Sequence, residues 1–150
     1  MAYPSLKLID ALKATADKLA RQETEYRWTH MGACNCGHLA QHVTRLSAAE
    51  LRRLSQDKAG EWADQALEHC ATSGIPMDDV IGALLELGLA PEDIGHLERL
   101  SDKRVLRLLP PKDRHLDFRR RDDVVRYLRT WATLLDTRLK AEAMLLPKVA

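Results

Sequence analysis

Apolar residues recur at three- and four-residue steps along most of the chain, which is the spacing of one face of an α-helix. The first clear example runs from about Ser5 to Gln22, with apolar positions at Leu6, Ile9, Leu12, Ala16 and Leu19. The last runs from about Arg121 to Glu142, and its buried stripe should contain Val124, Val125, Leu128, Trp131, Leu135 and Leu139. No stretch alternates apolar and polar residues for long enough to require a β-strand.

Helix start and stop signals divide the rest of the chain into shorter segments. A capping-box pattern, Ser47 to Glu50, predicts one helix start, and prolines with acidic neighbours predict two more, near Pro76 and Pro91. Further short helices are expected at about 36–46 and 61–70, and from Ser101-Asp102 to the prolines at 110–111. The sequence therefore predicts a single all-α domain over residues 1–150. Its architecture is an irregular bundle of six to eight helices, several of them short, with one long loop at about residues 24–36.

Composition agrees with a folded domain and narrows its partners. The 150 residues are 45% hydrophobic and 30% charged, which is globular rather than disordered composition. Lys and Arg number 23 against 22 Asp and Glu, so the chain lacks the basic excess that nucleic-acid binding usually requires. We therefore expect no strong nucleic-acid interaction, and a protein partner or a homo-oligomer stays open.

Cysteine usage and the first residues of the chain bear on its compartment. Three cysteines are too few, and odd in number, for a secreted disulfide framework. The first twenty residues carry charges among their apolar positions, unlike a signal peptide. No uncharged apolar run reaches the roughly 18 residues of a membrane helix. We expect a soluble cytoplasmic protein without membrane contact.

The segment HMGACNCGHLAQH, residues 30–42, is the main candidate for chemistry. Thiolates and imidazoles are the usual ligands of zinc and suit other transition metals. On a helix the histidines at 38 and 42 would share one face. The Cys-x-Cys spacing differs from zinc-finger knuckles, and three cysteines exclude a four-cysteine cluster. We predict a site for zinc or another transition metal, with candidate ligands Cys34, Cys36, His38, His30 and His42.

A second interpretation makes Cys36 a reactive thiol, so whether the protein is an enzyme stays open. At a helix start, unpaired amides and the helix dipole lower a thiol's pKa. Cys34 would then be the supporting or resolving thiol, and the candidate bases are His30, His38 or a distant histidine: His69, His96 or His115. The string Asn35-Cys36-Gly37 is similar to the nucleophile segments of papain-like cysteine enzymes. That resemblance covers a few residues only, and the strands of that fold are not evident here.

A third interpretation is a helical interaction module without chemistry, in which residues 30–42 form a packed turn. Cysteine is commonly a buried small hydrophobe, and a run of charges is commonly a solvated face. Arg119-Arg120-Arg121 is such a run, and it is followed directly by two aspartates. Positive residues nearby could bind an anionic group, as a minor alternative: Lys103, Arg104, Arg107, Lys112 and Arg114.

Overall fold

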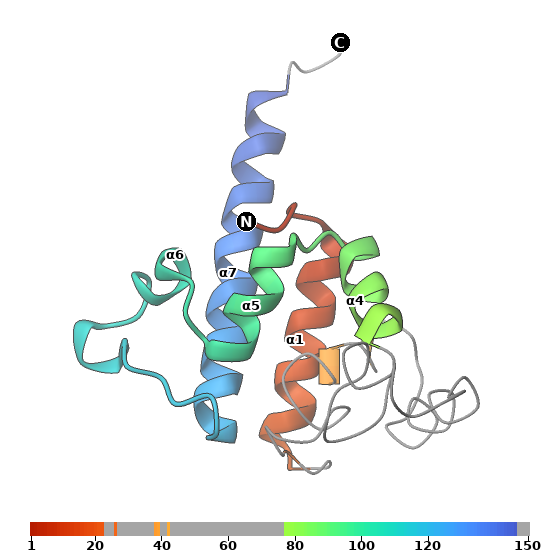
Figure 1. Ribbon diagram of the computed structural model, residues 1–150. Helices are drawn as coiled ribbons and strands as arrows, with labels where there is room; N and C mark the ends of the chain where they lie inside the picture. Colours follow the sequence, from red (N-terminus) through yellow and green to blue (C-terminus); the bar gives the residue numbers. More distant parts are fainter. Residues whose placement is uncertain (23–25, 27–37, 40–41, 43–76, 147–150) are drawn as a thin grey trace, which may run out of the picture.

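The computed structural model describes residues 1–22, 26, 38–39, 42 and 77–146, and all regular structure within them is helical. These residues contain five α-helices and a short 3₁₀ helix (Figure 1): α1 Leu6–Ala20, α4 Met77–Glu86, α5 Pro91–Arg99, α6 Lys103–Leu106, η2 Pro111–Asp113 and α7 Arg121–Leu145. The predicted all-α class is confirmed for this part of the chain. The segments expected at 47–54 and 61–70, and most of those at 24–36 and 36–46, lie outside the described residues.

The two longest helices, α1 and α7, lie side by side and run in opposite directions (Figure 1). Asp17, near the end of α1, pairs with Arg129 at 3.0 Å, and the Ala2 carbonyl accepts a hydrogen bond from Arg138, further along α7. The facing side chains form the centre of the core: Leu8, Leu12, Leu19, Val124, Leu128, Trp131 and Leu135. Burying each such side chain contributes about 1.5–3 kcal/mol, so this contact is the main source of stability among the described residues.

The predicted start of α1 is correct, but one predicted apolar position is not buried. Ser5 is the N-cap, and its hydroxyl accepts from the Leu8 amide at 3.1 Å. Leu6, placed on the apolar face in the sequence analysis, is exposed. At 3.6 residues per turn, Leu6 lies roughly 120° around the helix from Leu12, at the centre of the buried stripe. Leu6, three residues before the buried Ile9, therefore lies outside the face that contacts α7.

The helix opened by Asp102 is shorter than its sequence pattern predicts. The Asp102 carboxylate accepts from the Arg104 amide, but α6 ends at Leu106 rather than continuing to the prolines. The Arg114 guanidinium donates to the carbonyls of Arg107 and Leu109 at 3.2 and 3.0 Å. These carbonyls are thus satisfied without further helical turns, and Pro111 begins η2 instead of following a helix.

The first residues of the chain are fastened to the turn between α4 and α5. The Tyr3 amide donates to the Gly88 carbonyl at 3.0 Å. Gly88 has a φ of +108°, a backbone conformation that disfavours any residue with a Cβ.

Among the described residues, no helix combines the length and the apolar character needed to cross a membrane.

Replacing Leu128 by alanine should lower the free energy of unfolding by about 2–5 kcal/mol, because the leucine is fully buried at the α1–α7 contact. Leu145 on the same helix is 84% exposed, so Leu145→Ala is the matched control and should change stability by less than about 0.5 kcal/mol. Urea denaturation measures both. Equal effects of the two substitutions would contradict this packing.

Candidate functional site

Of the predicted metal or thiol residues, His38 has the most defined surroundings. Its side chain is 3% exposed, and the following residue, Leu39, belongs to the hydrophobic core. The imidazole stacks on the ring of Tyr26, with 6.2 Å between ring centroids and an interplanar angle of 27°. The Tyr26 hydroxyl donates to the Phe118 carbonyl, 92 residues further along the chain. His38 is therefore a buried, oriented imidazole inside the fold.

Of the other predicted site residues, only His42 lies in the described part of the chain. His42 is helical, as expected, but its side chain is exposed. His30, Cys34 and Cys36 lie outside the described residues. Within the described residues, no three His, Cys, Asp or Glu side chains are grouped so that they could hold a metal ion.

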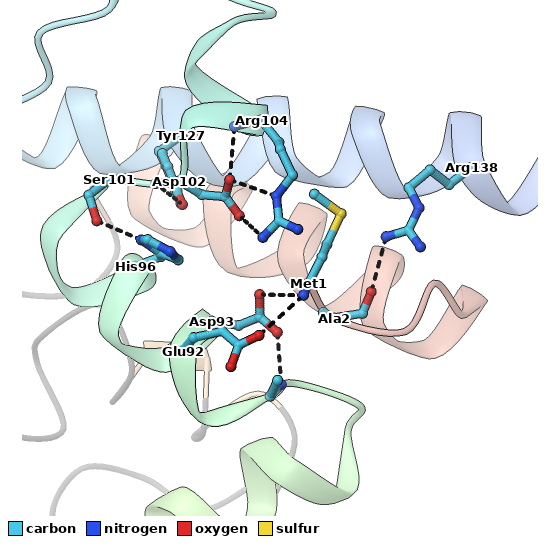
Figure 2. Close-up of polar contacts among 11 residues, drawn as sticks. Met1, Ala2, Glu92, Asp93, His96, Ser101, Asp102, Arg104, Tyr127 and Arg138 are labelled. Carbon is cyan, nitrogen blue, oxygen red and sulfur yellow. Dashed lines mark hydrogen bonds and ion pairs between the residues drawn. The ribbon is translucent and has the colours of Figure 1, made fainter.

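A second group of polar side chains lies where α5, α6 and α7 meet (Figure 2). We call it the polar cluster, and its members are Asp93, His96, Ser101, Asp102, Arg104 and Tyr127. Asp93 and Asp102 are 1% and 3% exposed, which is rare for carboxylates unless they are paired. The two carboxylates of the cluster therefore require compensating partners.

Asp102 is the most heavily bonded member of the polar cluster. Its two carboxylate oxygens accept from Arg104 Nε at 3.0 Å and Nη2 at 2.9 Å, a bidentate pair. Burial by itself raises the pKa of Asp102. The hydrogen bonds and the positive charge of Arg104 outweigh this effect and hold the pKa below its ordinary value of 3.8. Asp102 is therefore an ionised structural partner rather than a proton donor near neutral pH.

Tyr127 connects this ion pair to the core. Its hydroxyl oxygen accepts from the Asp102 amide at 3.3 Å, and its ring lies 6.1 Å from that of Trp131. Burial raises the pKa of the Tyr127 phenol well above its ordinary value of 10. The phenol therefore stays neutral at physiological pH and positions the start of α6 against α7.

Asp93 performs a similar role at the start of α5. One oxygen of its fully buried carboxylate accepts from the Ala90 amide at 2.8 Å, and this bond closes the first turn of the helix. The other oxygen lies 3.8 Å from the ammonium group of Met1, which also lies 3.6 Å from Glu92. The opposite charge compensates part of the cost of burying this carboxylate.

His96 and Ser101 are the one pair in the cluster with the elements of a nucleophile and a base. His96 Nδ1 lies 2.8 Å from the Ser101 hydroxyl. The Ser101 amide, however, also donates to the His96 carbonyl at 3.1 Å, and Leu100 between them has a positive φ of 52°. Both contacts close the C-terminal end of α5. We assign the pair to helix termination, and the cluster as a whole to joining three helices.

Sequence patterns identified the helix starts at Asp93 and Asp102 but not the cluster that they form. The sequence predicts only local roles for them, Asp93 in the first turn of one helix and Asp102 as the cap of the next. Asp102 is held by Arg104 and Tyr127 and Asp93 by the Met1 ammonium, and no local spacing brings Tyr127 to Asp102, 25 residues earlier. No protein-family model, curated protein or solved structure matches the chain.

The lowered pKa of Asp102 should make stability fall in acid. A carboxyl whose pKa is lower in the folded than in the unfolded state contributes stability above its unfolded value. That contribution is lost as the pH falls from about 3.8 through the folded pKa. Asp102→Asn keeps an acceptor for the Arg104 amide but removes the charge, so its urea-denaturation midpoint should change less over this pH range.

Asp136→Asn is the control for this prediction. The pKa of Asp136 is also lowered, by the hydrogen bond from Lys140, but this pair lies on the surface, where solvent screens it. Its effect should therefore be smaller and should fade in high salt. Profiles of Asp102→Asn and the unmodified protein that run parallel below pH 4 would rule out this role for the buried pair.

Proposed function

We propose that the protein binds zinc or another transition metal ion through Cys34, Cys36 and His38, with His30 or His42 as the remaining ligand. The observation that carries the proposal is the burial of the His38 imidazole, two residues after Cys36 in the sequence. A buried imidazole close in sequence to two thiols supplies the ligand types that zinc prefers. Magnesium prefers oxygen ligands and would bind these sulfur and nitrogen ligands poorly.

The contact between His38 and Tyr26 supports the proposal because it restricts the imidazole ring. Ligands bind a metal well when neighbouring groups hold them in one orientation. The stacking on Tyr26 restricts the ring plane, and the hydrogen bond from Tyr26 to Phe118 restricts Tyr26 itself. Binding a metal through His38 would thus cost little side-chain freedom, since that freedom is already lost in the fold.

The number of protein ligands would decide what the metal does. Four protein ligands close a tetrahedral site and make the ion structural, whereas three leave a position for water or substrate. A thiolate site also fits a reducing cytoplasm, which we propose as the compartment. We retain the prediction of six to eight helices, because the start and stop signals at 36–46, 47–54 and 61–70 are those of helices.

Protein purified without chelator should contain about one equivalent of a transition metal by elemental analysis. Cys34→Ser and Cys36→Ser should each lose most of it, because serine is a poor ligand for a soft ion. His38→Gln should also lose metal. Cys70→Ser is the matched control, since it removes a thiol distant in sequence from the segment, and should keep the full equivalent.

Two outcomes would contradict the proposal. One is a metal content below about a tenth of an equivalent in the unmodified protein. The other is an equal loss of metal in all three cysteine variants, which would indicate unfolding rather than coordination. If metal is absent and rapid alkylation by iodoacetamide disappears only in Cys36→Ser, the thiol interpretation replaces the metal site.

A further inference from the structure

Positive charge is concentrated in one segment of a nearly neutral chain. Residues 99–121 hold nine of the 23 Lys and Arg residues but only three of the 22 Asp and Glu residues. This segment, which we call the basic arm, carries a net charge of +6, whereas the rest of the chain carries −5. It runs from the last residue of α5 through α6 and η2 to the first residue of α7, and Figure 1 shows most of it projecting from one side of α7.

The basic arm is held in shape by its own hydrogen bonds. Arg114 donates to the carbonyls of Arg107 and Leu109, which follow α6. The Asp123 carboxylate on α7 accepts from the Asp117 amide at 3.0 Å, and Asp113 lies 3.9 Å from Arg126. The arm is therefore attached to α7 near its start, and its charges are carried on a fixed backbone.

Several cations of the basic arm are free to bind a partner. Arg104 and Arg114 are engaged within the fold, and Arg119 lies over the Phe118 ring, 5.6 Å from its centroid. Other side chains are exposed and make no hydrogen bond or ion pair with any described residue: Arg99, Lys103, Arg107, Lys112 and Arg120. Such a gathering of like charges raises the local concentration of anions around it.

We propose that the basic arm binds the phosphate backbone of double-stranded nucleic acid. Protein–protein interfaces are depleted of lysine at their centre and enriched in large apolar residues, whereas nucleic-acid interfaces are strongly positive. Leu108 is the only large hydrophobic side chain of the arm that is exposed. The guanidinium groups of the arm also match the geometry of phosphate oxygens. The composition therefore fits phosphate better than an acidic protein.

The shape of the arm indicates contacts that do not read the base sequence. Base reading in the major groove needs a helix or a β-ribbon, and α6 has only four residues. Single-strand binding relies on exposed aromatic rings, and the one aromatic residue of the arm, Phe118, is partly buried. The net charge of the whole chain, which argued against nucleic-acid binding, is near zero because the positive basic arm and the negative remainder cancel.

Fluorescence anisotropy with a labelled duplex of about 20 base pairs tests the inference. At about 50 mM salt the full chain should bind with a dissociation constant between about 1 and 100 µM. Affinity should fall steeply on raising the salt to about 200 mM, because counterions are released on binding. RNA and DNA duplexes should bind alike, since only phosphates are recognised.

Two double variants of equal net charge locate the binding surface. Lys103→Glu with Lys112→Glu reverses two exposed charges of the arm, and Lys7→Glu with Lys13→Glu reverses two exposed charges of α1. The arm variant should weaken binding at least about tenfold, whereas the α1 variant should stay within about threefold of the unmodified protein. If circular dichroism shows that a glutamate variant is unfolded, the corresponding alanine pairs are compared instead.

Several results would overturn the inference. One is the absence of duplex binding at about 50 mM salt. Another is equal weakening by the two double variants, which would indicate an effect of overall charge. Tighter binding to poly-glutamate or to anionic phospholipid vesicles than to the duplex would assign the arm to an acidic protein or to a membrane surface instead.

Discussion

The contact between α1 and α7 is the interaction on which the rest of the described structure depends. It buries Leu8, Leu12 and Leu19 of α1 against Leu128, Trp131 and Leu135 of α7. A helix as short as α1, with 15 residues, is marginal alone in water, and helices in proteins gain most of their stability from burial of an apolar face. The remaining described helices and the first residues of the chain are then arranged around this pair. Loosening it would also loosen Asp102, which reaches α7 through Tyr127.

Two sets of charged residues in the molecule have opposite physical roles. In the polar cluster, Asp93 and Asp102 are buried, and each lies beside a positive group and accepts a hydrogen bond from one backbone amide. In the basic arm, which shares Arg104 with the polar cluster, five positive side chains are exposed and unmatched among the described residues. Unmatched charge is tolerated only in water, where it costs little and remains available to a partner. The exposure of each set therefore follows from how completely its charges are paired.

Helix periodicity and capping residues were sufficient to predict most of what the described residues show. Ser5 and Pro91 predicted the starts of α1 and α5, and the stripe from Val124 to Leu135 predicted the buried face of α7. These features depend on neighbours within one or two turns. The predicted end of α6 was wrong: the carbonyls of Arg107 and Leu109, just after the helix, accept from Arg114, which periodicity does not reveal.

The features of the candidate site that the sequence did not predict are contacts between residues far apart along the chain. The predicted helix conformation at His38 and His42 agrees with the structure, whereas nothing in the spacing predicted that Tyr26 would stack on His38 or bond to Phe118. The gathering of Cys34 and Cys36 around His38 stays a prediction. The positive residues of the basic arm can be seen in the sequence. Which of them are available to a partner depends on which ones the fold already engages, and only the structure shows this.

The pairing of α1 with α7 has a consequence for how the chain acquires its fold. The partners Asp17 and Arg129 are separated by 112 residues, and Ala2 and Arg138 by 136. Contacts of such separation require a large loop to close before burial can compensate for the lost entropy, which slows folding relative to bundles with local contacts. During synthesis, the leucines of α1 therefore emerge from the ribosome long before their partner exists. The nascent chain must keep this apolar stripe from aggregating until α7 has been made.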